Sequence, residues 1–143
     1  QSMAPSFDTG EYLIVDQLSY QFNNPERGDV IVFRSPRNPS VFFIKRIVGL
    51  PGETVEINRG EVIIHNTRHP DGIKINEPYV EFAETSSFRA TLGATEYFVL
   101  GDNRQASSDS RSWGPLERDL IQGKPIIRLF PLQTFDLLPG SYQ

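Results

Sequence analysis

The sequence predicts a mainly β fold, a coiled, barrel-like antiparallel sheet with little helix. Glycine and proline each occur 11 times in 143 residues, and they separate short runs of β-branched and aromatic residues. No segment maintains the 3.6-residue hydrophobic period of an amphipathic helix. Because this length suffices for one hydrophobic core but not for two ordinary domains, we expect a single domain over residues 1–143.

Strands are expected where apolar or β-branched runs lie between turn residues. In chain order these runs cover 12–18, 29–34, 41–48, 54–58, 61–65, 97–101 and 125–129. The clearest hairpin joins the fourth run to the fifth through Asn58-Arg59-Gly60, in which Gly60 supplies the positive φ of the turn.

The rest of the chain carries weaker patterns. The only helix is expected at 116–122, and it is short. Residues 66–95 are polar and contain turn residues, so they are expected to form an excursion with one or two short strands. The tail, 130–143, contains two prolines and is expected to be irregular.

Composition argues against several classes of partner. The net charge is −4, and the eleven arginines and three lysines are scattered, so no basic stripe for a nucleic acid is expected. The chain has no cysteine, which excludes disulfides and thiolate metal sites. His65 and His69 lie in a polar stretch where nothing organises carboxylates around them, so we expect two exposed loop histidines. Neither a metal nor a cofactor is expected.

No part of the sequence looks like a membrane span or a secretory signal. No run approaches the roughly 18–20 apolar residues that cross a bilayer, so the chain as given is expected to be soluble. The chain opens at Gln1 and enters an interpretable motif at its second residue. We therefore expect the natural N-terminus, with any anchor, to lie upstream.

Lys45 stands out among the three lysines because apolar residues surround it. Lys74 and Lys124 lie near glycines in turn-like contexts, where a solvated ammonium is expected. In a strand, the side chain of Lys45 shares a face with Phe43 and Ile47. Burial lowers a lysine pKa by up to about 3–5 from its usual value near 10.4, which would make the amine a usable base near neutrality. Alternatively, Lys45 lies on an edge or outward face with its stem along apolar neighbours.

A neutral amine is chemically useful where a hydroxyl lies within hydrogen-bond reach. Serine is a poor nucleophile until a neighbouring base removes its proton. Ser2 is the candidate, although a serine beside a chain end carries no weight alone.

Four sequence motifs, in a fixed order along the chain, support Ser2 as the candidate nucleophile. They are Ser2-Met3-Ala4-Pro5-Ser6 with Gly10, then 27–33, then 43–53 around Lys45, and Gly101-Asp102-Asn103-Arg104 with Ser107, Asp109, Ser110 and Arg111. Together they resemble the boxes of type I signal peptidases, serine proteases with a Ser/Lys dyad, and they extend from Ser2 to Pro115. The last motif is the most specific. It is also expected to be a tight turn with an ion pair between Asp109 and Arg111.

The resemblance implies a role for each matched residue. Ser2 would be the acylated nucleophile, and Lys45 the base for acylation and for the deacylating water. Ser107 would hydrogen-bond and orient the amine of Lys45. The supporting residues would be Asp102, Asn103, Arg104, Asp109 and Arg111. The backbone N–H of Ser2 would donate to the oxyanion, while the second donor of the family lies before the start of this chain.

The resemblance also implies the substrate. An extended segment of an exported pre-protein would add as a strand beside the Lys45 strand. Met3, Phe7, Phe43 and Ile44 would line shallow pockets for small residues, which predicts Ala-X-Ala cleavage sites; each of the four also suits an ordinary core. Ser6 stands where the family usually has threonine, and Glu11 where it usually has aspartate.

The compact excursion at 66–95 is consistent with a cyanobacterial or plastid-type enzyme. A missing anchor would hold it at the lipid surface of a plasma or thylakoid membrane, with the catalytic domain on the extracytoplasmic or lumenal side. Two alternatives remain open on the sequence. One is a LexA-like self-cleaving protease, which shares the fold core and the Ser/Lys chemistry. The other is a peptide-binding β module that has lost catalysis.

Overall fold

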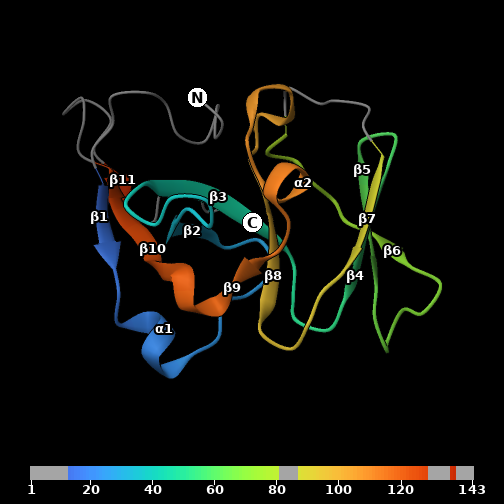
Figure 1. Cartoon of the computed structure of the whole chain (residues 1–143), viewed down its shortest axis with the longest axis horizontal. Coiled ribbons are helices and arrows are strands. Elements are labelled where there is room, and N and C mark those ends of the chain that lie inside the picture. Colours follow the sequence, from blue (N-terminus) through green and yellow to red (C-terminus); the bar gives the residue numbers. More distant parts are fainter. Residues whose placement is uncertain (1–12, 81–86, 129–135, 138–143) are drawn as a thin grey trace.

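The fold is built from antiparallel β-strands, as the sequence predicts (Figure 1). The computed structural model describes residues 13–80, 87–128 and 136–137. The strands are β1 (Leu13–Asp16), β2 (Val30–Arg34), β3 (Phe42–Gly49), β4 (Thr54–Asn58), β5 (Glu61–His65), β6 (Ile73–Lys74), β7 (Phe88–Thr91), β8 (Glu96–Leu100), β9 (Leu116–Glu117), β10 (Ile121–Arg128) and β11 (Asp136–Leu137). The helical elements in these ranges are α1 (Ser19–Phe22), α2 (Ser110–Trp113) and 3-10 turns at Arg104–Ala106 and Arg118–Leu120.

The strands form two sheets that stand side by side in Figure 1. Within the described ranges, the larger sheet has seven strands in the order β1-β10-β2-β3-β8-β9, with β11 paired to β10. The smaller sheet has four strands in the order β6-β5-β4-β7. Its strands β6 and β7 are the short strands expected in the polar excursion at 66–95. The smaller sheet is therefore built from the chain between β3 and β8, and the excursion at 66–95 supplies two of its four strands.

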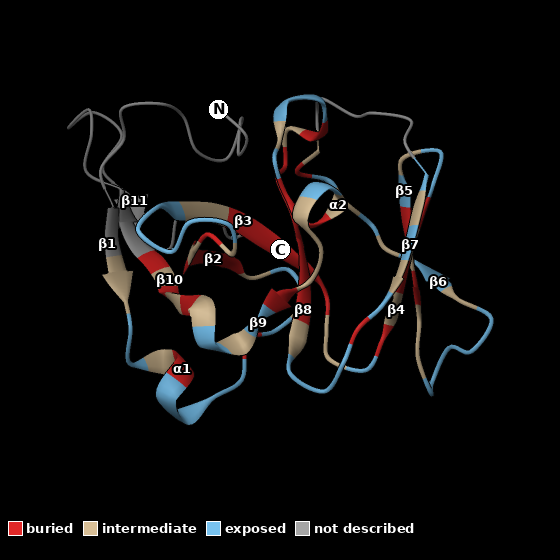
Figure 2. Cartoon of the chain, viewed as in Figure 1, coloured by how far each residue is buried: buried red, intermediate tan, exposed pale blue. Residues whose placement is uncertain are grey.

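Strands β3 and β8 supply both hydrophobic cores. Successive side chains of a strand point to opposite faces, so Ile47 packs into one core and Val48 into the other. Neighbouring residues of β8 divide in the same way. The first core contains Tyr20, Ile31, Phe33, Ile47, Tyr97, Val99, Leu116 and Ile121. The second contains Val48, Val55, Ile57, Val62, Ile64, Leu92, Phe98 and Leu100. Figure 2 shows this burial concentrated where the two strands cross the middle of the molecule.

A buried carboxylate fixes the passage from β3 to the smaller sheet. Glu53 receives two hydrogen bonds from Arg27, at 2.6 and 2.7 Å, and one from the backbone N–H of Leu50 at 2.8 Å. Asn66 donates to the same carboxylate at 2.9 Å. Burial alone would raise the pKa of Glu53, but the hydrogen bonds from Arg27 and Asn66 outweigh it and lower the pKa below its usual value. Glu53 therefore ties both sheets to one loop.

The hairpin between β4 and β5 is confirmed, with one addition. Asn58 pairs with Glu61, so the turn consists of Arg59 and Gly60 alone. Gly60 has the expected positive φ of 81°, and Arg59 also has a positive φ, of 52°. Two successive positive φ values match the type I′ turn that suits a right-handed hairpin.

The predicted helix at 116–122 is wrong. Leu116 pairs with Tyr97 and Ile121 pairs with Phe33, so both ends of this segment are strands. Only Arg118–Leu120 between them forms a 3-10 turn. Local pattern favoured a helix, but Leu116 and Ile121 pair with two strands of the larger sheet, and both are buried there.

Two smaller expectations also need correction. His65 is not a loop residue but ends β5, where its ring lies 2.8 Å from the carboxylate of Glu56; His69 is exposed as expected. The tail is not wholly irregular, because Asp136–Leu137 pairs with β10; the remainder of 130–143 lies outside the described residues. In the ranges that the structure covers, no helix is long and apolar enough to cross a bilayer.

We predict that Gly49→Ala weakens the junction of the two sheets. An added Cβ would lie 2.4 Å from a methyl carbon of Val55 and 3.0 Å from Phe98, in the second core. Overpacking of this kind costs about 1–3 kcal/mol of unfolding free energy, measurable by urea denaturation. Gly93→Ala is the matched control, because the nearest atoms to its Cβ would belong to the flexible side chain of Glu96, at 3.2 Å and beyond. Equal stability of the two variants would contradict the prediction.

Candidate active site

Lys45 is buried in β3, just before the point at which β8 begins to pair with that strand. Strand β3 pairs with β2 on one side and β8 on the other, and Lys45 is opposite Ile31. Its side chain is on the same face as Phe43 and Ile47, and the Phe43 ring centroid is 5.5 Å from Nζ. Only 3% of the residue is exposed. The alternative of an outward-facing, solvated lysine is therefore wrong.

The surroundings of Lys45 favour its neutral form. Burial is the largest influence, and it lowers the pKa of the amine to about 8. The carboxylates of Asp109 and Asp102 act in the opposite direction, while the guanidinium of Arg111 lowers the pKa further. At neutral pH a useful fraction of the amine is therefore unprotonated.

The side-chain hydroxyl of Ser107 lies within hydrogen-bond distance of the Lys45 amine. Nζ of Lys45 donates to Oγ of Ser107 over 3.2 Å. Ser107 in turn donates to Oδ2 of Asp109 over 2.8 Å. The hydroxyl thus has an acceptor for its proton and presents its oxygen to the amine, which fixes the direction of the lysine side chain.

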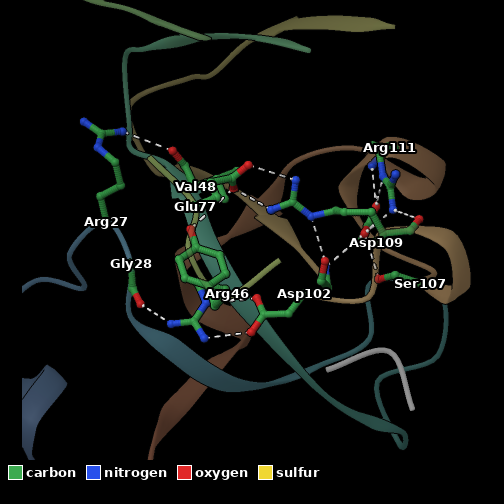
Figure 3. A network of polar contacts seen from close by, with 12 residues as sticks. Arg27, Gly28, Arg46, Val48, Glu77, Asp102, Ser107, Asp109 and Arg111 are labelled. Atoms are coloured by element: carbon green, nitrogen blue, oxygen red, sulfur yellow. Dashed lines mark hydrogen bonds and ion pairs between the residues drawn. The ribbon is translucent and has the colours of Figure 1, made fainter. Parts of the chain in front are cut away.

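Asp109 organises the turn between β8 and α2. It is fully buried, accepts a hydrogen bond from the backbone N–H of Gly101 at 3.1 Å, and caps α2 by accepting from the N–H of Arg111. The guanidinium of Arg111 donates to both oxygens at 2.9 Å, so the predicted ion pair is confirmed (Figure 3). Burial would raise the pKa of Asp109, but Arg111 and the other donors outweigh it and lower the pKa.

Arg46 and Asp102 form a second buried pair on the opposite face of β3. Nε and Nη2 of Arg46 donate to the two oxygens of Asp102 at 2.9 and 2.7 Å, and Nη1 donates to the carbonyl of Gly28 at 3.0 Å (Figure 3). The guanidinium also lies 3.9 Å from the ring centroid of Tyr79. A buried arginine remains charged, so it needs this number of partners. The sequence placed Arg46 in a motif but gave no reason to assign it a contact.

Arg104 has a partner that the sequence did not suggest. Its guanidinium forms an ion pair with Glu77, from the polar excursion, and its Nε donates to the carbonyl of Gly101 at 2.8 Å. No periodic pattern or turn signal marks Glu77, because its residue type is ordinary in an exposed loop. Only the tertiary fold brings this carboxylate to the turn.

The predicted site residues divide into those that the structure brings together and those it does not describe. Lys45 and the turn residues Asp102, Asn103, Arg104, Ser107, Asp109 and Arg111 gather at the end of β8. Phe43 and Ile44 are both half-buried, on opposite faces of β3, and Phe43 also packs edge-on against Phe33 with centroids 6.0 Å apart. Ser2, Met3 and Phe7 lie outside the described residues.

No metal-binding group of three or more His, Cys, Asp or Glu side chains is found where the structure describes the chain. The chemistry available at this site is instead that of a buried amine beside a hydroxyl. Such a pair can accept and return a proton, provided that a reacting group lies within reach of Nζ.

We predict that Lys45→Met stabilises the fold at neutral pH. The folded pKa of about 8 lies below the unfolded 10.5, so burial of the ammonium costs about 3 kcal/mol below pH 8. Between these two values the folded state binds fewer protons, and the cost disappears as the pH rises to 10.5. The gain in unfolding free energy should therefore shrink over this pH range, as measured by denaturation at several pH values. Lys74→Met, at an exposed ion pair with Glu61, is the control. A gain that is the same at every pH would refute the prediction.

The comparisons with known proteins agree on one family. The family model described as signal peptidase, peptidase S26, matches residues 1–130. A signal peptidase I of Leptolyngbya laminosa is 38% identical over 99% of this chain and 72% of its own length. A probable signal peptidase I-1 of Synechocystis is 37% identical over the same shares.

A solved structure agrees with the sequence matches. The crystal structure of a signal peptidase I from Enterococcus faecalis is 34% identical, with a TM-score of 0.60 over 71% of this chain and 97% of that chain. The mainly antiparallel β fold described above is thus similar to that of a solved signal peptidase I. This chain therefore belongs to the signal peptidase family of serine endopeptidases, peptidase S26.

Proposed function

We propose that this protein removes signal peptides from exported pre-proteins, with Ser2 as nucleophile and Lys45 as general base. The observation that carries the proposal is the buried amine of Lys45, 3.2 Å from the hydroxyl of Ser107 and with a pKa lowered to about 8. A fold keeps a lysine in such surroundings at a cost in stability, and perturbed pKa values of this kind are typical of catalytic sites. Membership of the signal peptidase family supports the same activity.

The proposed reaction proceeds through an acyl-enzyme. Oγ of Ser2 attacks the carbonyl carbon of the scissile peptide bond while its proton passes to the neutral Nζ of Lys45. The tetrahedral intermediate collapses when Lys45 returns that proton to the departing amine. Lys45 then takes a proton from water, whose oxygen attacks the acyl carbon, and returns it to Oγ of Ser2. The backbone N–H of Ser2 stabilises the oxyanion in both steps.

The turn at 101–111 serves this reaction by holding the base. Ser107 fixes the direction of the Lys45 amine, and Asp109 fixes the hydroxyl of Ser107. Asp102 binds the guanidinium of Arg46, the residue after the base, so the backbone of β3 is held at the same point. Asn103 and Arg104 complete the turn. We assign all of these residues to the support of Lys45 and not to the bond-breaking steps.

Pairing along β3 supports an extended mode of substrate binding. Among the described residues, β8 pairs with β3 only from Arg46 to Gly49, whereas β2 pairs with it from Phe42 to Arg46. The first half of β3 therefore has one edge at which a peptide can add as a further strand. Phe43 and Ile44 lie along this edge and, with Met3 and Phe7, would select small side chains in an Ala-X-Ala site.

The proposed activity also implies a location. Signal peptides emerge at the membrane across which a pre-protein is exported. We therefore propose that the catalytic domain acts at a plasma or thylakoid membrane, on its extracytoplasmic or lumenal side.

Substitution of the two reacting groups tests the mechanism. With a peptide that contains an Ala-X-Ala site, Ser2→Ala and Lys45→Ala should each reduce kcat by about 10³-fold or more, because each removes a group that the chemical step requires. Ser107→Ala should reduce kcat by roughly 10-fold to 100-fold, because the amine remains but loses its orientation.

Ser108→Ala, at the exposed neighbour of Ser107, is the matched control and should leave kcat unchanged. Unchanged turnover in Ser2→Ala or Lys45→Ala would rule out the mechanism, and would favour a peptide-binding module. Cleavage confined to the chain itself, with no processing of an added peptide, would favour a self-cleaving protease instead.

The pH dependence of cleavage provides a separate test. Lys45 acts as a base only when unprotonated, so kcat/KM should rise with pH and level off above its pKa of about 8. The measurement is kcat/KM for the same peptide from pH 6 to pH 10. An activity that is already maximal at pH 6 would show that another group is the base.

A further inference from the structure

The segment 75–80 of the polar excursion reaches the catalytic turn with two side chains. Glu77 binds Arg104, and the ring of Tyr79 covers the guanidinium of Arg46 at 3.9 Å. Arg104 belongs to the turn that carries Ser107, and Arg46 follows Lys45 in β3. Figure 3 shows Glu77 and Ser107 at opposite sides of the polar network. The segment 75–80 therefore contacts one side chain of the catalytic turn and one side chain of β3, the two elements that hold the proposed base.

The contact between Glu77 and Arg104 has the geometry of a bidentate pair. Nη1 donates to Oε1 at 3.2 Å, and Nη2 donates to Oε2 at 2.5 Å. The Arg104 side chain is 4% exposed and that of Glu77 is 11% exposed. Two parallel charge-assisted bonds in a nearly dry environment fix the plane of the guanidinium as well as its position.

Arg104 transmits this position to the turn. Its Nε donates to the carbonyl of Gly101 at 2.8 Å, and its own carbonyl accepts from Nη2 of Arg111 at 3.0 Å. Arg111 binds Asp109, which accepts the hydrogen bond of Ser107. A continuous series of contacts therefore leads from Glu77 to the hydroxyl beside Lys45.

We propose that Glu77 is a positioning residue for the base, acting through Arg104 to keep Ser107 within hydrogen-bond reach of Lys45. The inference rests on the proposed roles of Lys45 and Ser107. Without the carboxylate, a buried guanidinium loses its anionic partner, and the other carboxylates of the turn are Asp102 and Asp109. These two already bind Arg46 and Arg111, so a new contact from Arg104 would disturb one of the pairs that surround the amine.

The substitutions are chosen to separate charge from position. Glu77→Gln removes the charge at nearly constant shape, and Glu77→Asp keeps the charge but withdraws the carboxylate by one methylene. Both should lower kcat for the Ala-X-Ala peptide by roughly 10-fold to 100-fold with KM changed less than twofold, because a displaced base slows the chemical step. Glu61→Gln, which removes an exposed ion pair with Lys74 in the smaller sheet, should leave both constants unchanged.

The pH profile provides a readout that a purely structural role would not change. Among the described residues, the charged groups that act on Lys45 include Asp109, Asp102 and Arg111, all from the turn. Without the Glu77 carboxylate, the positive charge of Arg104 loses its anionic partner. A contact of Arg104 with Asp109 would also reduce the stabilisation that Asp109 gives to the Lys45 ammonium. Both effects lower the pKa of Lys45. The rise of kcat/KM should therefore move to lower pH in Glu77→Gln and stay in place in Glu77→Asp and Glu61→Gln.

A double-mutant cycle tests whether the effect passes through Arg104. Arg104→Lys keeps the charge and removes the fork, so the double variant Glu77→Gln/Arg104→Lys should lose no more than about threefold in kcat beyond the worse single variant. Fully multiplicative losses would show that the two residues act separately and would overturn the proposal.

An NMR titration of the lysine Nζ decides the matter even without peptidase activity. Lys45→Met assigns the Lys45 signal among the three lysines of the chain. The titration midpoint of Lys45 should fall in Glu77→Gln and not in Glu61→Gln, whether or not the protein cleaves the peptide. An inactive wild-type protein would refute the proposed function, and the midpoint alone would then test Glu77.

Two results would overturn the inference. One is a wild-type kcat in Glu77→Asp, and the other is an unchanged Lys45 midpoint in folded Glu77→Gln. If Glu77→Gln does not fold, as judged by circular dichroism, Glu77→Asp decides through kcat.

Discussion

The structure depends on keeping the amine of Lys45 buried beside apolar side chains of β3. Burial lowers its pKa to about 8, which is the property that makes the amine a base. The same burial opposes folding at neutral pH, since the ammonium is favoured in water. The neighbouring turn offsets part of this cost with the carboxylates of Asp109 and Asp102, which favour the charged form. The site is thus a compromise between a base that is neutral enough to react and a charge that the fold can tolerate.

Lys45 and Arg46 are adjacent in sequence, yet the surroundings of Lys45 favour its neutral form and those of Arg46 stabilise its charge. Arg46 cannot lose its proton, and it is given a bidentate carboxylate, a carbonyl and an aromatic ring. The interactions of Lys45 include a hydroxyl at 3.2 Å and a phenyl ring at 5.5 Å. Because side chains alternate along β3, these two environments lie on opposite faces of one strand. The 101–111 turn reaches both faces, which explains how one turn can serve a structural cation and a reactive one.

The sequence predicted the parts of this site that depend on local pattern. The apolar run around Lys45 indicated a buried strand, and the spacing from Gly101 to Arg111 indicated the turn with its internal ion pair. Glu77 could not be predicted, because a glutamate in a polar stretch looks solvated until the tertiary fold gives it a buried arginine. The segment 116–122 was predicted wrongly for a related reason: its helical pattern was weak, and pairing of Leu116 and Ile121 with distant strands determined its structure. The positive φ of Arg59 could not be predicted either, because the two-residue length of its turn follows from the register of β4 and β5.

Because β3 and β8 contribute side chains to both cores, local unfolding of one sheet affects the other. An ordinary peripheral sheet can separate from a domain while the remainder keeps its packing. Here, separation of the smaller sheet would uncover Val48, Phe98 and Leu100, whose strand neighbours form the first core. Local opening on that side is therefore coupled to the packing around Lys45, and we expect the two sheets to exchange their amide hydrogens as one cooperative unit.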